Sequence, residues 1–279
     1  METLRPFAAL SVEEARGLRG LVFDLDDTVL DHGALTEVAY SALFRLRESG
    51  LRLVACTGRP AGWSEVLLRQ WPIDAAVAEN GAVALIKETR EGGANRIVTL
   101  FPTNMAETSG ERDELLGLAR QLVARFPDAD LADDNAARWT DVTIDIGEHR
   151  KVGAETISAM RAETQARNVS TFVSSVHLHL SFSTADKASG TLRLLEERFG
   201  ESKDVACRVN AFVGDSGNDA SAFATFQTTF GVANVRKHLA SLSKPPKFVM
   251  KQAMGLGFAE LASGLTALRG VDGDQKQSG

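Results

Sequence analysis

The stretch LVFDLDDT, residues 21–28, decides the fold of this chain. Its three apolar residues run directly into an acidic cluster, Asp24, Asp26 and Asp27, which Thr28 follows. A short apolar run that ends in carboxylates is typical of a buried parallel strand with polar groups at its C-terminal edge. The stretch therefore predicts one strand of a parallel sheet, with a polar site where the strand ends.

The chain on either side of this strand alternates between strand-like and helix-like segments. Ser11 and Glu14 have the spacing of a capping box, which predicts a short helix just before the strand. Further elements are expected in the order helix, strand, helix, strand, at residues 35–49, 51–55, 62–70 and 75–78. This alternation predicts βαβ units, and so an α/β protein with a Rossmann-like parallel-sheet core.

The βαβ rhythm is lost between residues 83 and 181. Strands are expected there at 83–86, 97–100, 142–146, 170–174 and 177–181, and helices at 111–126 and 155–168. This order predicts an inserted α+β domain over residues 83–181, with a core built from residues 1–82 and 182–279. The returning core is expected to contain helices at 187–199 and 260–268 and strands at 211–213, 230–232 and 248–249, with residues 270–279 disordered.

Composition narrows the function without naming it. The 279 residues are 44% hydrophobic and 24% charged, as in an ordinary globular protein, and the net charge of -6 differs from that of a basic nucleic-acid binder. No run approaches the roughly 20 apolar residues of a membrane helix, and residues 1–20 do not resemble a signal peptide, so we expect a cytoplasmic location and no nucleic-acid or membrane partner. Cys56 and Cys207 are expected to be free thiols.

Polar clusters follow the predicted strands at three places, and a lysine opens a predicted helix. In a doubly wound sheet such strand ends gather at one crevice. Two carboxylates as close as those of the first cluster repel each other and are best explained by a bound cation. An acidic chain must also create local positive charge for any phosphate site from a metal, a lysine or helix N-termini. The clusters are Asp24-x-Asp26-x-Thr28, Thr57-Gly58-Arg59, Lys187 and Gly214-Asp215-x-x-Asn218-Asp219.

Each cluster alone has an ordinary alternative. The first fits a helix cap, the second a plain turn, the lysine a solvated side chain, and the last an Asx turn. A calcium-binding EF-hand loop requires glycine at the position of Val29 and an acid at that of Leu35, and neither is present. Only the four clusters together indicate a single site.

Taken in order, the four clusters resemble the signature of the haloacid dehalogenase superfamily. The match spans about residues 21–268, and the insertion resembles the large α/β cap of its sugar-phosphatase branch. The segments ENGA at residues 79–82 and GLGFAE at residues 255–260 resemble mannosyl-3-phosphoglycerate, sucrose-phosphate and Cof-type phosphatases.

The resemblance implies a Mg²⁺-dependent phosphatase that hydrolyses a small phosphorylated metabolite, a sugar phosphate or a glycosyl-phosphoglycerate, through an aspartyl-phosphate. It makes Asp24 the nucleophile and a metal ligand. It makes Asp26 the general acid and base, with its backbone carbonyl also at the metal. The remaining roles are phosphate binding by Thr57, Gly58, Lys187 and Asn218, and metal binding by Asp215 and Asp219.

The motifs leave several points open. Asp27 stands where many relatives have glycine, and aspartate tolerates unusual backbone angles better than most residues. Two alternatives to the phosphatase are a phosphomutase or phosphotransferase that uses the same nucleophile, and a non-catalytic binding protein, in which catalytic residues would be lost. A monomer and a small homo-oligomer are both compatible with the sequence. Substrate contacts are predicted for the cap, where the candidates are Arg138, Trp139, Arg150, His177 and His179, and for Arg59 near the phosphate.

Overall fold

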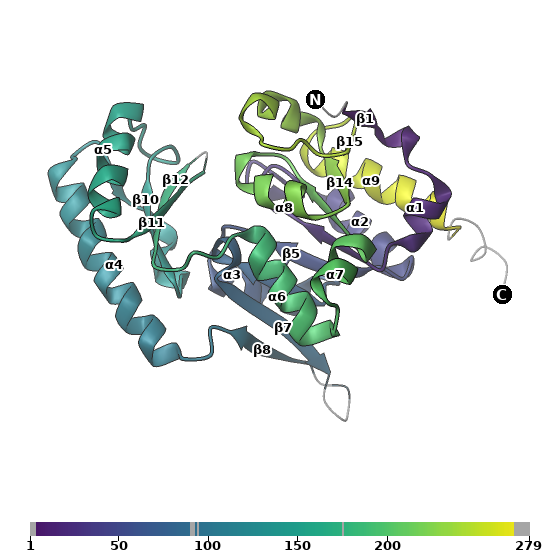
Figure 1. Cartoon of the computed structure of the whole chain (residues 1–279), viewed down its shortest axis with the longest axis horizontal. Coiled ribbons are helices and arrows are strands. Elements are labelled where there is room, and N and C mark those ends of the chain that lie inside the picture. The colour runs from purple at the N-terminus through teal and green to yellow at the C-terminus, as the bar shows by residue number, and fades with distance from the viewer. Residues whose placement is uncertain (1–3, 90–92, 94, 175, 271–279) are drawn as a thin grey trace.

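The computed structural model describes residues 4–89, 93, 95–174 and 176–270. These residues form a nine-stranded and a four-stranded sheet, each flanked by helices, and one two-stranded hairpin (Figure 1). The large sheet has nine strands, parallel from its β1 edge to β6 and antiparallel beyond. Their spatial order is β1 (Arg5–Pro6), β15 (Phe248–Val249), β14 (Thr228–Gly231), β13 (Asn210–Gly214), β2 (Gly20–Phe23), β5 (Arg52–Cys56), β6 (Ala75–Ala78), β7 (Val83–Thr89) and β8 (Asn95–Phe101). The predicted α/β class with a parallel-sheet core is therefore confirmed.

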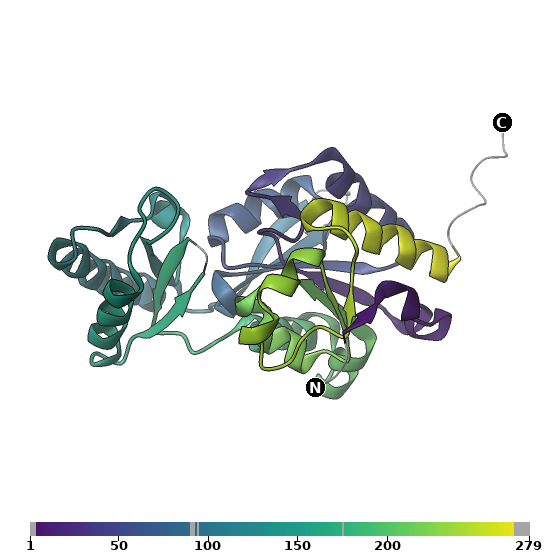
Figure 2. The ribbon, with the colours of Figure 1, turned by 90° about the horizontal axis from the view of Figure 1, so that it is seen from above.

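Strand β2 lies in the middle of the large sheet and is buried on both faces. Alternate side chains of a strand point to opposite faces, so Leu21 and Phe23 pack into one hydrophobic core and Val22 into another. The first core is covered by α1 (Val12–Gly17), α2 (Glu37–Glu48), α3 (Ala61–Gln70) and α9 (Met254–Arg269). The second is covered by α6 (Lys187–Phe199), α7 (Lys203–Val209) and α8 (Ala220–Thr225), on the opposite face of the sheet (Figure 2).

Strands β7 and β8 belong to the large sheet, and this corrects the predicted domain boundary. Val83 pairs with Ala78 at the start of an antiparallel β6–β7 ladder, and β8 pairs in turn with β7. The loss of the βαβ rhythm at residue 83 marks a change from parallel to antiparallel pairing within one sheet. The insertion therefore does not start at residue 83, and we refer to residues 102–181 as the cap.

The cap consists of a four-stranded antiparallel sheet with helices on one face. The strand order is β11 (Ser170–Val173), β12 (His177–Ser181), β10 (Asp141–Asp145), β9 (Asp130–Leu131), and the helices are α4 (Met105–Arg125) and α5 (Ala154–Gln165). Val142, Ile144, Leu178 and Leu180 pack in the apolar core of the cap. The alternate positions, His177 and His179 among them, point to the other face, as the two-residue spacing predicts.

Helix ends differ from the predicted ones where glycine or a cap residue intervenes. The Ser11 capping box is present, with Glu14 accepting from the Ser11 backbone at 3.0 Å. Helix α4 begins at Met105 because the side chain of Asn104 caps it. Helix α9 begins at Met254, earlier than predicted, and glycine permits close packing in its added first turn: a methyl group at Gly257 would overlap the backbone carbonyl of Gln252.

Two further expectations concern the ends of the chain and membranes. Within the described residues, no helix combines the length and the apolar character needed to span a bilayer. The disorder expected for residues 270–279 falls almost wholly on 271–279, which lie outside the described residues. A short hairpin of β3 (Leu30–Asp31) and β4 (Ala34–Leu35) follows the acidic cluster at the end of β2.

Candidate active site

Three carboxylates meet at the C-terminal edge of the large sheet. Asp24 directly follows β2, Asp215 follows the adjacent parallel strand β13, and Asp219 lies in the short 3-10 helix η4 (Gly217–Asp219). Each offers an oxygen within 4.8 Å of the others, and each is almost completely buried. Adjacent parallel strands end at the same edge, so the pairing of β2 with β13 brings together residues about 190 positions apart.

Lys187 lies directly beside this cluster. It is the first residue of α6, whose N-cap Asp186 forms a capping box with Ser189. The Nζ atom donates to Asp24 Oδ1 at 2.6 Å and to Asp219 Oδ1 at 2.7 Å, and the side chain is wholly buried. A buried ammonium requires such partners, because an unpaired buried charge is costly.

The cluster carries more negative charge than Lys187 balances. Burial, and then the charge of neighbouring carboxylates, raises the pKa of Asp215 to about 9; burial raises that of Asp24 to about 7 despite the opposing charge of Lys187. A divalent cation would relieve this repulsion. Carboxylate oxygens are the ligands that hard cations such as Mg²⁺ prefer, so the donor set fits a magnesium ion.

The two acidic residues of the loop after β13 have different surroundings. Asp219 is engaged on both oxygens: Oδ2 accepts from the backbone N–H of Asp215 at 2.8 Å, and Oδ1 accepts from Lys187. Asp219 thus orders the loop and holds the lysine. Asp215 accepts from Asn234 Nδ2 at 2.8 Å, and the same amide donates to the backbone carbonyl of Asp27 at 2.9 Å.

Asn234 was not among the predicted site residues, although a signal was available. It follows β14 in the 3-10 helix η5 (Ala233–Lys237), as Asp215 follows β13. The rule that polar residues after parallel strands gather at one edge therefore applies to it as well. Its amide joins the Asp27 backbone to the Asp215 carboxylate, and so links two of the sequence clusters.

Asp26 and Asp27 diverge from Asp24. Both oxygens of Asp26 accept from Arg59, with Nε at 2.9 and 3.0 Å, and the Asp26 side chain is 49% exposed. The guanidinium of Arg59 also lies over the ring of Trp63, 4.1 Å from its centroid. Asp27 has φ of 55°, the left-handed conformation that glycine adopts most easily, so aspartate does take the required backbone angle here.

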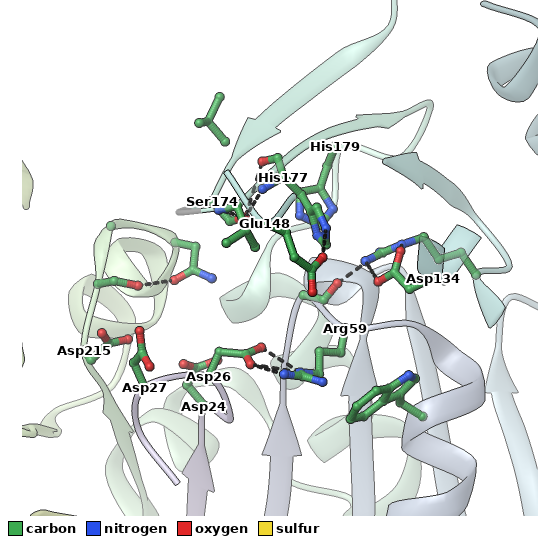
Figure 3. A pocket seen from close by; sticks show the side chains of 18 of the residues that line it. Asp24, Asp26, Asp27, Arg59, Asp134, Glu148, Ser174, His177, His179 and Asp215 are labelled. Atoms are coloured by element: carbon green, nitrogen blue, oxygen red, sulfur yellow. Dashed lines mark hydrogen bonds and ion pairs between the residues drawn. The ribbon is translucent and has the colours of Figure 1, made fainter. Parts of the chain in front are cut away.

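A cavity of about 630 Å³ opens above these residues, between the core and the cap (Figure 3). Among the predicted site residues, Asp24, Asp26, Gly58, Asp215 and Asn218 line it. Thr57, Lys187 and Asp219 do not, because they lie fully buried behind its floor. The hydroxyl of Thr57 accepts from the backbone N–H of Arg59 at 3.0 Å, which stabilises the turn that carries Gly58.

The predicted cap residues divide into two groups. Arg138, His177 and His179 line the cavity, whereas Trp139 and Arg150 are not among its lining residues. The guanidinium of Arg138 is buried, donates to the backbone carbonyl of Gly58 at 3.1 Å, and so connects the cap to the turn after β5.

A second connection between core and cap runs through Glu79, which the sequence pattern did not single out for a role. Its carboxylate accepts from the backbone N–H of Ala61 at 3.0 Å in the core. From the cap it accepts the backbone N–H groups of Trp139, Thr140 and Asp141 at 2.8, 2.7 and 3.2 Å, and the Thr140 hydroxyl. Burial, assisted by Asp141, raises the pKa of Glu79 to about 7.

Comparison with known proteins agrees with this geometry. Residues 21–96 match the family model described as haloacid dehalogenase-like hydrolase, and no curated protein matches the chain. Three similar solved structures are a protein of Thermoplasma acidophilum (18% identity, TM-score 0.68, covering 90% of this chain and 99% of that one), the sucrose-phosphatase of Synechocystis sp. in complex with sucrose and phosphate (16%, 0.62, 90% and 98%), and the C-terminal domain of C. albicans trehalose-6-phosphate phosphatase (12%, 0.63, 96% and 98%).

At these identities the structural likeness shows the fold, which extends over about nine tenths of the chain. The family match covers the first cluster of acids, the turn after β5, and strands β6 and β7. Residues 21–96 are therefore similar to the haloacid dehalogenase-like hydrolases, and the solved structures share the fold of nearly the whole chain.

Proposed function

We propose that this protein is a Mg²⁺-dependent phosphatase that hydrolyses a small phosphorylated metabolite through an aspartyl-phosphate on Asp24. The observation that carries the proposal is the convergence of Asp24, Asp215 and Lys187 beneath a cavity large enough for a sugar-sized ester. The solved relatives include phosphatases whose names specify sucrose and trehalose 6-phosphate, which favours a phosphorylated sugar.

Asp24 lies at the floor of the cavity, and in the proposed mechanism it attacks the phosphoryl group. Its Oδ1 is bound by Lys187 and its Oδ2 accepts from the Thr28 hydroxyl at 3.4 Å, so the carboxylate is held in one orientation. Lys187 supplies fixed positive charge beside the charge that develops on the phosphoryl oxygens. Attack forms a bond from an Asp24 oxygen to phosphorus and breaks the bond to the ester oxygen, which is covalent catalysis.

Asp26 is the candidate to protonate that leaving oxygen and then to take a proton from the attacking water. In the structure both its oxygens are bound by Arg59. An Asp26 oxygen must be free of this guanidinium to reach the leaving oxygen, so the proposed mechanism requires Arg59 to release Asp26 as the substrate binds.

Asp24 and Asp215 are the carboxylates that would hold Mg²⁺. Asp219 orders the loop after β13 and binds Lys187. When bound, the ion supplies positive charge that lowers the repulsion between an anionic nucleophile and a phosphate dianion. The backbone carbonyl of Asp27 is held by Asn234, which keeps the turn after Asp24 in place.

The test is phosphate release from a panel of phosphorylated metabolites, with MgCl₂ and with EDTA, by the wild type and Asp24→Asn. We expect release that depends on Mg²⁺ and is lost in the variant. Activity that persisted in EDTA, or full activity of Asp24→Asn, would contradict the mechanism. Conversion of a substrate into a phosphorylated isomer without release of free phosphate would instead identify a phosphomutase, which uses the same nucleophile.

A further inference from the structure

The cap side of the cavity contains four basic side chains, and each of them faces a carboxylate. All belong to lining residues that the structure describes. Because their partners neutralise them, they leave no surplus positive charge toward the bound substrate. The pairs are Arg138 with Asp134 and Asp141, His177 with Glu148, His179 with Asp141, and His149 with Asp133.

Arg138 is the one arginine among these four basic side chains, and its guanidinium is bound by two carboxylates. Its Nε and Nη2 donate to the two oxygens of Asp134 at 2.9 and 2.6 Å, and its Nη1 donates to both oxygens of Asp141 at 3.0 and 3.1 Å. The Arg138 side chain is 1% exposed. A bidentate carboxylate pair of this kind leaves the guanidinium no free edge for a substrate carboxylate.

Of the three histidine pairs, that of His149 with Asp133 is exposed, whereas those of His177 and His179 are closer and more buried. The carboxylate of Glu148 pairs with His177, whose Nε2 lies 3.0 Å from Glu148 Oε2 (Figure 3). The loop that carries Glu148 is ordered by Asp145, whose carboxylate accepts four backbone N–H groups of residues 147–150 at 2.8–3.1 Å. His179 Nδ1 lies 2.8 Å from the buried Asp141. Glu148 is thus presented to the cavity by a preorganised turn.

The charge count of the wall decides what it can bind. Asp133, Asp134, Asp141 and Glu148 stand against one arginine and three histidines, so the wall is negative when the imidazoles are neutral and balanced when all are protonated. A second anionic group that points to this wall would meet no uncompensated cation among these residues, and it would be repelled when the imidazoles are neutral. Hydroxyl groups, by contrast, can donate to carboxylate oxygens and exchange hydrogen bonds with imidazoles.

We infer that the cap selects phosphate monoesters whose leaving group is rich in hydroxyls and carries no second anionic group, and that it rejects phosphorylated acids. This inference rests on the proposed phosphatase function and narrows it: of the two substrate classes that the sequence leaves open, it favours sugar phosphates over glycosyl-phosphoglycerates.

The test compares esters that differ in one group. Glucose 6-phosphate is paired with 6-phosphogluconate, and glycerol 3-phosphate with 3-phosphoglycerate, and kcat/KM is measured with Mg²⁺ for each. We expect the ester without a carboxylate, here called the neutral ester, to be preferred over its acidic counterpart by at least about 10-fold in kcat/KM, a difference of about 1.4 kcal/mol. Hydrolysis of p-nitrophenyl phosphate reports the core chemistry separately from recognition by the cap.

A variant assigns the preference to the cap wall. Glu148→Gln removes one carboxylate and should reduce the neutral-to-acidic ratio by about 5-fold, because relief of one like charge is worth about 1 kcal/mol. Asp130→Asn is the matched control, since Asp130 is an exposed cap carboxylate outside the cavity lining, and it should leave the ratio unchanged.

The outcomes separate the two claims. Equal hydrolysis of the acidic and neutral esters, or a ratio that Glu148→Gln does not change, would overturn the inference and leave the phosphatase intact. No phosphate release from any ester, including p-nitrophenyl phosphate, would overturn the proposed function and this inference with it.

Discussion

Replacing Asp215 by asparagine should make the metal-free protein more stable while abolishing its response to Mg²⁺. The raised pKa values of Asp215 and Asp24 show that folding gathers carboxylates that repel one another. Asparagine has nearly the same shape and keeps an oxygen to accept from Asn234, but it carries no charge. The substitution therefore removes repulsion without opening a cavity.

The expected gain follows from the pKa of Asp215. Burial raises this pKa from 3.8 to about 9, so the stability that the protein has below about pH 4, where Asp215 is protonated in both states, is lost progressively as the pH rises to about 9. At pH 7 folding must protonate a group about three pH units above its unfolded pKa, which costs about 4 kcal/mol at 1.4 kcal/mol per unit. Because Asp24 and Asp219 share the repulsion, we expect the asparagine to recover about half of this, about 2 kcal/mol.

The assay is urea unfolding at pH 7, followed by the fluorescence of the three tryptophans, in EDTA and in MgCl₂. In EDTA, Asp215→Asn should unfold at higher urea than the wild type, and an exposed control, Asp128→Asn, should not. Mg²⁺ at 100 times its dissociation constant should stabilise the wild type by about 2.7 kcal/mol, and more at pH 8 than at pH 6, but not the variant. A variant less stable than the wild type in EDTA, or equally stabilised by Mg²⁺, would refute the reasoning.

Three further outcomes are expected. Asp24→Asn should lower kcat/KM by about 10³-fold or more in the phosphate-release assay, with a cooperative thermal transition showing that the variant is folded, and retained activity would exclude Asp24 as the nucleophile. Lys187→Met should lower the free energy of unfolding in EDTA by about 3–5 kcal/mol, because it leaves the two carboxylates that flank the ammonium without their partner; urea midpoints that coincide with those of the wild type would argue against a buried pair. Gly190→Ala should destabilise by about 2 kcal/mol or more, because its methyl group would overlap the backbone of Gly81, whereas Gly110→Ala in an exposed helix position should gain about 0.5–1 kcal/mol; calorimetry of both variants tests whether the two changes differ in sign.

The sequence predicts the elements of this fold better than their pairing. The strands near residues 83 and 97 were expected and are present, yet their apolar patterns do not specify which sheet they join. The pairing of β7 with β6 depends on the turn at residues 79–81, where Glu79, Asn80 and Gly81 all have positive φ. Asparagine and glycine favour such angles, but glutamate does not, so the full turn is not evident from the sequence.

The candidate site shows the same division. The acids after β2 and β13 could be placed at one edge because strand ends converge there, whatever the side chains do. The burial of Lys187 could not be predicted, because a lysine at a helix start is usually solvated and only the packing of α6 against the sheet removes it from water. The pairing of Asp26 with Arg59 could not be predicted either, because it depends on side-chain rotamers rather than on the order of the strands.

The link through Glu79 bears on how such proteins diverge. Three of its four donors in the cap are main-chain N–H groups, which every residue except proline provides. Mutations at residues 139 and 140 can therefore accumulate while the cap stays attached to the core, and recognition can change toward new metabolites without loss of the assembled reaction centre. The constraint falls on Glu79 itself, because only a carboxylate side chain offers two strong acceptor oxygens to these N–H groups.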